Sequence, residues 1–120
     1  MLWQIGCLYG AASVAFGAFG AHGLRKRISD PQKLANWSTA AHYQLVHSGV
    51  VLIATSIVPK NKLASGLFIA GMTMFSGSIY LLVLDPQRFK ALGPVTPLGG
   101  LCLIAGWVAL GFASRGRLTL

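Results

Sequence analysis

Apolar residues in this chain gather into four long runs separated by short polar segments. The runs cover residues 3–24, 37–58, 63–84 and 97–114, and none contains Asp, Glu, Lys or Arg. About 20 apolar residues in a helix cross the ~30 Å hydrocarbon core of a bilayer. The pattern predicts an all-α protein: an integral membrane four-helix bundle, antiparallel, with short loops. Residues 1–120 form one transmembrane domain in this prediction.

The start of the second helix is marked by local sequence. Asp30 followed by Pro31 places an N-cap residue before a proline at the first helical position. Ser29 with Gln32 offers an alternative capping box. The second helix is therefore expected to begin at Pro31, ahead of the membrane-spanning stretch that starts at Trp37.

Two further pairs repeat this signal later in the chain. Thr96 and Pro97 predict that the fourth helix begins at Pro97. Asp85 and Pro86 predict a short surface helix over residues 86–92, within the third connection.

Basic residues lie between the apolar runs. The connection at residues 59–62 is too short for anything but antiparallel neighbours, so four spans place both termini on one side. That side carries Lys60, Lys62, Arg115 and Arg117. The opposite side carries Arg25, Lys26, Arg27, Lys33, Arg88 and Lys90. The positive-inside rule then favours the first and third connections in the cytoplasm or matrix.

Composition supports the membrane interpretation. The chain is 54% hydrophobic and 10% charged, whereas about a quarter of the residues of a soluble domain are charged. The net charge of +8 would suggest nucleic acid in a soluble protein. Basic residues confined to the connections of a membrane protein instead face lipid headgroups, so the expected partner is the bilayer and not nucleic acid.

Close helix contacts are expected where glycines line the runs. Lipid tails are as apolar as leucine, so helices in a membrane associate through small residues that let their backbones approach. Of the fifteen glycines, those predicted to pack helices together are Gly6, Gly10, Gly17, Gly20, Gly71, Gly77, Gly100 and Gly106.

The second run carries the most polar stripe. Gln44, His47 and Ser48 share one helical face, and Tyr43 lies one turn before His47. At ~1.5 Å per residue from Trp37, His47 lies roughly 15 Å deep. Ionisable residues at such depth are functional candidates. His47 is expected either to clamp this helix to a neighbour by hydrogen bonds or to act as the polar relay of a small transporter.

Two other histidines raise the possibility of a cofactor. His22 ends the first run and His42 lies ~7–8 Å below Trp37 on the same side of the membrane. The pair could share a haem or a metal ion, as bis-histidine sites in helical bundles do. His42 and His47 point about 140° apart and cannot serve together.

Reaction chemistry is missing from the sequence. There is no Ser-His-Asp set, phosphate-binding loop or metal-ligand spacing, so no catalytic residue is predicted and an enzyme is not expected. The leading hypothesis is a structural or accessory component of a membrane complex or homo-oligomer, without a cofactor. The alternatives are a haem or metal carrier using His22 and His42, and a transporter relying on His47.

Four sequence segments resemble a known family. They are Gly17-Ala-Phe-Gly-Ala-His-Gly23, Trp37-x-Thr-Ala-x-x-Tyr-Gln-x-x-His47, Gly71-x-x-x-Phe-Ser-Gly-Ser-x-Tyr-x-Leu82, and Gly93-Pro-Val-Thr-Pro-Leu-Gly-Gly100 with Gly106-Trp107. In this order they resemble "domain of unknown function 423", whose animal member is called transmembrane protein 256. The resemblance implies four transmembrane helices and no assigned activity. It also implies a bacterial cytoplasmic membrane or, in a eukaryote, a mitochondrial or other internal membrane.

Overall fold

Four α-helices make up most of the computed structural model, which describes residues 1–113. They are α1 (Leu2–Ala21), α2 (Pro31–Ile57), α3 (Lys62–Leu84) and α4 (Val95–Ala113). Short 3₁₀ helices, Leu24–Lys26 and Lys90–Leu92, lie in the first and third connections. The all-α antiparallel architecture predicted from the apolar runs is confirmed. Ser114, Arg115 and Arg117 lie outside the described residues.

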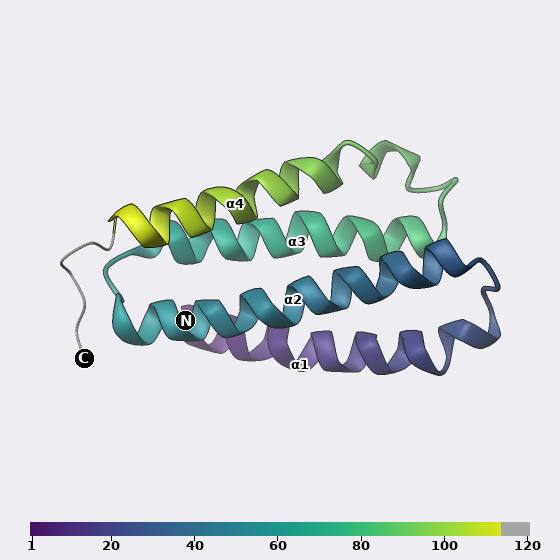
Figure 1. Ribbon diagram of the computed structural model, residues 1–120, viewed down its shortest axis with the longest axis horizontal. Coiled ribbons are helices and arrows are strands. Elements are labelled where there is room, and N and C mark those ends of the chain that lie inside the picture. The colour runs from purple at the N-terminus through teal and green to yellow at the C-terminus, as the bar shows by residue number, and fades with distance from the viewer. Residues whose placement is uncertain (114–120) are drawn as a thin grey trace.

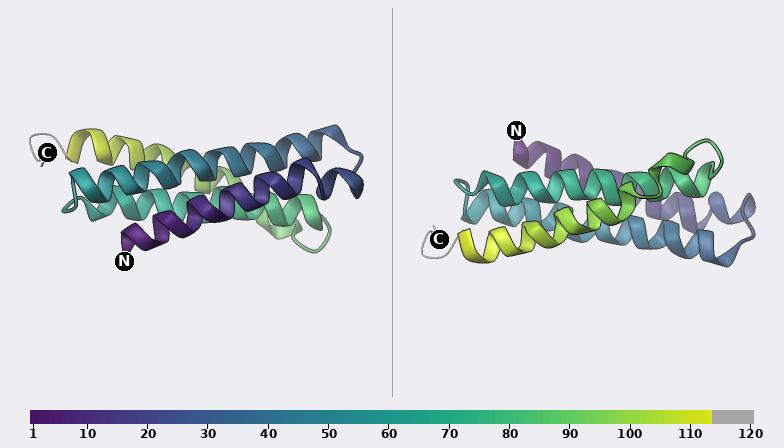
Figure 2. Two further views of the ribbon diagram at one scale, coloured as in Figure 1. Left: turned by 90° about the horizontal axis from the view of Figure 1, so that it is seen from below. Right: turned by 90° about the horizontal axis from the view of Figure 1, so that it is seen from above.

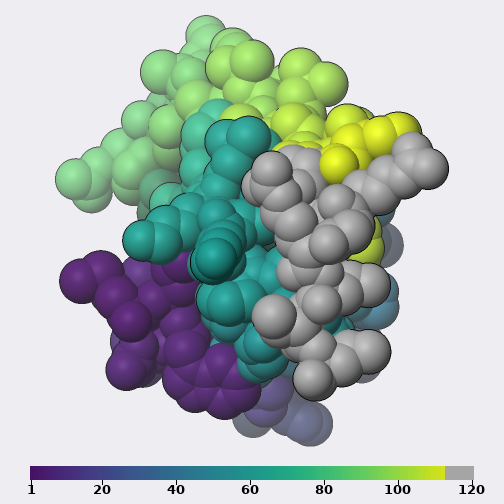
Figure 3. All heavy atoms as spheres, turned by 90° about the vertical axis from the view of Figure 1, so that its left-hand side faces the viewer, coloured from purple at the N-terminus to yellow at the C-terminus, as the bar shows by residue number. Residues whose placement is uncertain are grey.

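The helices pack in chain order. α1 packs on α2, α2 on α3, and α3 on α4 (Figure 1). Figure 2 shows the same arrangement from below and from above: α1 lies against α2, and α4 lies against α3. An end-on view gives the same picture, with α1 and α4 on opposite sides of that pair (Figure 3). The start of α1, the α2–α3 connection and the end of α4 share one end of the molecule (Figure 1).

The first turn of α2 forms as the sequence predicts. Pro31 is its first residue, and the Asp30 carboxylate accepts a hydrogen bond from the Gln32 backbone N–H at 2.9 Å. Proline lacks only an N–H that would have no partner in the first turn. Asp30 is therefore the N-cap, and the alternative capping box built on Ser29 does not supply it.

Removal of this cap gives a first testable prediction. Asp30→Ala is expected to lower the free energy of unfolding by about 1 kcal/mol, because one N–H of the first turn loses its acceptor. Thermal unfolding in detergent, followed by circular dichroism at 222 nm, measures the change. Ser29→Ala is the control and should leave the transition unchanged. Equal losses in both variants would contradict the assignment of Asp30 as the cap.

The third connection differs from its prediction in two places. α4 begins at Val95 and not at Pro97, so Pro97 is the third helical residue, where a missing N–H still costs nothing. The Thr96 hydroxyl bonds the Ser78 hydroxyl of α3 and does not mark the helix start. The helix predicted over residues 86–92 is reduced to turns and the 3₁₀ helix Lys90–Leu92.

The outer surface of the helices is suited to lipid. Residues Leu2–Lys26, Lys62–Leu84 and Lys90–Phe112 form three helical segments that are long and apolar enough to cross a membrane. α2 is more polar, but its Gln44, His47 and Ser48 are buried. These three side chains therefore face protein, while large apolar side chains such as Leu45 and Ile53 are exposed.

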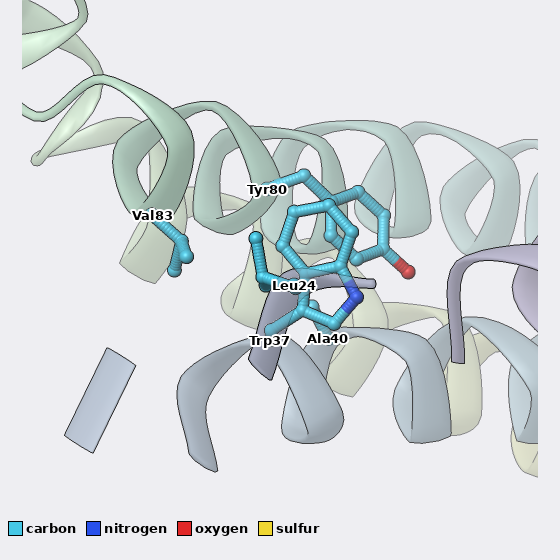
Figure 4. Close-up of a cluster of buried hydrophobic side chains, with 5 residues drawn as sticks. All are labelled: Leu24, Trp37, Ala40, Tyr80 and Val83. Carbon is cyan, nitrogen blue, oxygen red and sulfur yellow. The ribbon is translucent and has the colours of Figure 1, made fainter. Parts of the chain in front are cut away.

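Buried apolar side chains form two clusters along the bundle. One, near the first and third connections, contains Leu24, Trp37, Ala40, Tyr80 and Val83 (Figure 4). The rings of Trp37 and Tyr80 lie 4.7 Å apart, and the Trp37 indole N–H donates to the Phe16 carbonyl of α1 at 2.7 Å. The second cluster, toward the other end, contains Val51, Ala64, Phe68, Met72 and Leu103. The polar side chains of α2 lie between these clusters.

Candidate functional site in the middle of the bundle

Gln44 connects three helices. Its side chain is 6% exposed and projects from α2. The amide nitrogen donates to the Tyr9 carbonyl of α1, and the amide oxygen accepts from the Tyr80 hydroxyl of α3, each at 2.8 Å. A primary amide has both a donor and an acceptor end. Gln44 uses both ends for contacts between helices.

His47 connects α2 to α4. Its Nε2 atom accepts a hydrogen bond from the Trp107 indole N–H at 3.1 Å, and Nδ1 lies 2.6 Å from the Tyr43 carbonyl. The indole group can only donate, so Nε2 must be the unprotonated nitrogen and Nδ1 must carry the proton. The geometry thus defines a neutral imidazole of one tautomer, with both nitrogens in use.

Two further side-chain hydrogen bonds join neighbouring helices. Thr73 donates to the Ile69 carbonyl, so the Tyr9 hydroxyl donates to Thr73 and joins α1 to α3. Ser76 of α3 donates to the Ala40 carbonyl of α2 at 2.7 Å. Within residues 1–113, every buried side-chain nitrogen and oxygen has a hydrogen-bond partner. This is what a membrane interior requires, because an unpaired polar group is costly there.

The Ser48 side chain forms its hydrogen bond within α2. Its hydroxyl donates to the Leu45 carbonyl at 2.7 Å, and the side chain is 3% exposed beneath Gly10 of α1. Gln44, His47 and Ser48, which the sequence places on one stripe, therefore contact different partners. Gln44 faces α1 and α3, His47 faces α3 and α4, and Ser48 faces α1.

A groove of about 540 Å³ lies beside His47, between α2, α3 and α4. Its walls are mostly apolar and aromatic, and they consist of His42, Tyr43, Val46, His47, Phe75, Gly100, Leu103, Ile104 and Trp107. The Tyr43 ring is 42% exposed and lies 5.0 Å from the Phe75 ring and 5.9 Å from the His47 ring. We call this the aromatic groove.

The structure does not bring the two proposed haem ligands together. His42 lines the aromatic groove, which contains no α1 residue. Trp37 and Ala41 mark the face of α2 toward α1, and His42 is about 140° around the helix from Trp37. His22 is exposed at the end of α1. Residues 1–113 also hold no group of three or more His, Cys, Asp or Glu able to bind a metal ion.

Four of the predicted packing glycines line the contact between α1 and α2. An added Cβ at Gly6 would lie 2.9 Å from Leu52, and one at Gly20 would overlap Trp37. At Gly10 the nearest atom is the Ser48 hydroxyl at 3.3 Å, and at Gly17 it is Ala41 at 3.8 Å. Gly6 and Gly20 are therefore the tight positions, and Gly17 the loosest of the four.

Other glycines line the contact between α3 and α4. A Cβ at Gly71 would lie 2.6 Å from Leu103, and one at Gly106 would lie 2.8 Å from Phe68. Gly100 is looser, with Phe75 at 3.7 Å, and a Cβ at Gly77 would meet nothing within 4 Å.

Gly99 is a further glycine in the contact between α3 and α4. A Cβ there would overlap the backbone nitrogen of Phe75 and lie 2.8 Å from the carbonyl carbon of Met74. It is therefore a point where the backbones of α3 and α4 meet, as they also do at Gly71, where a Cβ would lie 2.9 Å from the Leu103 backbone nitrogen.

These features define a multi-pass α-helical membrane protein whose interior is held by hydrogen bonds between helices and by glycine contacts. The profile of the family described as "Protein of unknown function (DUF423)" matches residues 16–100. The chain belongs to this family, as its sequence motifs suggested.

Curated relatives come from fungi and bacteria. The chain is 42% identical to UPF0382 membrane protein C1782.12c of Schizosaccharomyces pombe, with 91% of this chain and 97% of the relative covered. It is 42% identical to UPF0382 membrane protein SAB0533 of Staphylococcus aureus, with 88% of each covered. It is 35% identical to UPF0382 membrane protein YwdK of Bacillus subtilis, with 88% and 89% covered. No solved structure matches the chain.

Proposed function

We propose that this protein is a structural or accessory membrane component that associates with a second copy or with a larger membrane complex. The proposal rests on the hydrogen bonds that the buried polar side chains of α2 already make. The amide of Gln44 and the Nε2 atom of His47 are engaged in contacts that hold helices together, and the Nδ1 atom of His47 is bonded to the Tyr43 carbonyl of its own helix. A polar relay built on Gln44 or His47 would have to break these hydrogen bonds before either side chain could reach a substrate.

A surface for association is available on α1. This helix packs mainly on α2, and only 11% of the apolar stretch within Leu2–Lys26 is buried, against 39% in α3. Small side chains follow one another along its exposed side, at Cys7, Ala11, Ala15 and Ala18. Small residues at such spacing allow another helix to approach closely in a membrane. We define these four residues as the small-residue face of α1.

Purification in a mild detergent tests the proposal. The mass of the particle, measured by light scattering or native mass spectrometry, is expected to exceed that of one chain through a second copy or a co-purifying protein. Ala15→Leu should shift the particle toward single chains, because the larger side chain separates the two helices. Gly66→Leu is the matched control, since Gly66 is exposed on α3 and has no neighbour within 4 Å of its Cβ position.

Cross-linking distinguishes the two forms of association. In a Cys102→Ser background, Cys7 is the one cysteine left and reports on contacts of the small-residue face. Rapid oxidation in native membranes gives a disulfide-linked dimer when two copies meet there, and a bifunctional thiol–amine reagent captures a different partner. A single-chain particle in every mild detergent, with neither product in native membranes, would contradict the proposal.

A further inference from the structure

A second hollow continues the line of the aromatic groove. It has a volume of about 400 Å³ and is lined by Lys33, Asn36, Ile79, Leu82, Val83 and Thr96. These residues belong to α2, α3 and α4, the same three helices that form the aromatic groove. Along each of the three helices they precede the groove residues in the direction from the first and third connections toward the middle. The two hollows therefore follow one another on one face of the molecule.

The length of this line matches one leaflet of a bilayer. On α2, Asn36 lines the hollow nearer the connections, and His47 lines the far end of the aromatic groove. At ~1.5 Å per residue they are separated by about 16 Å, and half of a hydrocarbon core is about 15 Å. An acyl chain that starts beside Asn36 would end beside His47 and Trp107. The volume of the aromatic groove also lies in the ordinary range of small-molecule sites.

Charge at the outer end of the line is positive. We define the basic end as the end that carries the first and third connections, with Arg25, Lys26, Arg27, Lys33, Arg88 and Lys90. The two acids there, Asp30 and Asp85, each accept a backbone N–H and are outnumbered by the basic residues. Of these basic residues, Lys33 lines the outer hollow. A lysine above an apolar groove complements a ligand with an anionic head and an apolar tail.

We propose that the two hollows form a binding site for one anionic phospholipid from the leaflet at the basic end. Lys33 and Asn36 contact the phosphate, and one acyl chain lies in the aromatic groove against Tyr43, Phe75 and Trp107. This inference goes beyond an accessory function, and it does not depend on the small-residue face of α1. It also differs from general attraction to a charged surface, because it places a single lipid between α2 and α4.

Quenching of Trp107 by brominated lipids tests the site. Trp107 lines the groove and is 47% exposed, whereas Trp37 is 3% exposed. Trp3 is removed by Trp3→Phe, and the protein is reconstituted in phosphatidylcholine vesicles. Phosphatidylglycerol or phosphatidylcholine with brominated acyl chains is then added in steps. Half-maximal quenching is expected at about fivefold less brominated phosphatidylglycerol, which is the preference that one lysine beside an anionic headgroup provides.

Two variants separate the headgroup contact from the groove. Lys33→Gln is expected to abolish the fivefold preference, and Lys60→Gln, at the opposite end, to retain it. Gly100→Leu fills the groove, because a Cβ there has ordinary contact with Phe75 at 3.7 Å. It should reduce quenching by both lipids, while Gly66→Leu should not.

Two results would overturn the proposal. Equal quenching by the two brominated lipids in the parent protein would show that only bulk lipid fills the groove. Weak quenching by both lipids, together with dissociation of a dimer by Gly100→Leu, would show that a helix of a second copy occupies it instead.

Discussion

Replacing Gly99 with alanine is expected to lower the free energy of unfolding by about 1–3 kcal/mol, the range for overpacking a closely packed interior. The added carbon would overlap the Phe75 backbone nitrogen and lie 2.8 Å from the Phe75 Cα. A side chain can rotate away from such a contact, but the backbone of α3 can yield only if the helices separate. Thermal unfolding in detergent measures the loss.

Gly77→Ala is the matched control for this prediction. It makes the same chemical change in α3, where the new Cβ has no neighbour within 4 Å. Alanine also favours the helix over glycine by up to ~1 kcal/mol in water, so the control should be neutral or slightly stabilising. If both variants unfold at the same temperature, the proposed meeting of the α3 and α4 backbones is wrong.

Gln44→Leu is expected to lower the free energy of unfolding by about 2 kcal/mol. The volume is nearly kept, but the Tyr80 hydroxyl loses its acceptor, and the Tyr9 carbonyl loses its side-chain donor while keeping its bond within α1. Hydrogen bonds between membrane helices average ~0.6 kcal/mol, and a buried group left without a partner costs ~1–3 kcal/mol. Unfolding of the purified protein in mixed micelles by increasing fractions of sodium dodecyl sulfate provides the measurement.

A double-mutant cycle isolates the Gln44–Tyr80 contact. Tyr80→Phe removes the hydroxyl that Gln44→Leu leaves without a partner, so the double variant should lose about 1 kcal/mol less than the sum of the single variants. Strict additivity would count against this hydrogen bond. Full stability of Gln44→Leu, together with loss of a measured flux, would favour transport over a structural function.

Sequence signals that act within one turn of a helix predict where α2 starts. Asp30 and Pro31 determine the start of α2, because the cap and the proline act on neighbouring backbone groups. The same logic misplaced the start of α4 by two residues. Proline is tolerated throughout the first turn, and Thr96 found a partner in Ser78 of another helix.

Features that depend on the register between helices could not be predicted. Gly77 and Gly99 look alike in the sequence, yet only Gly99 faces the backbone of a neighbouring helix. His47 is buried, but its partner Trp107 is 60 residues away. The separation of His22 from His42 likewise follows from which face of α2 contacts α1, and apolar periodicity does not reveal it.

The stripe of polar residues on α2 bears on how the chain enters the bilayer. A helix with Gln44 and His47 near its middle is less readily inserted by itself than α1 or α3, because polar groups in lipid need partners. The connection of residues 58–61 is short enough for α2 and α3 to enter as a hairpin, which pairs Gln44 with Tyr80 during insertion. Entry as a hairpin would make the insertion of α2 depend on the synthesis of α3.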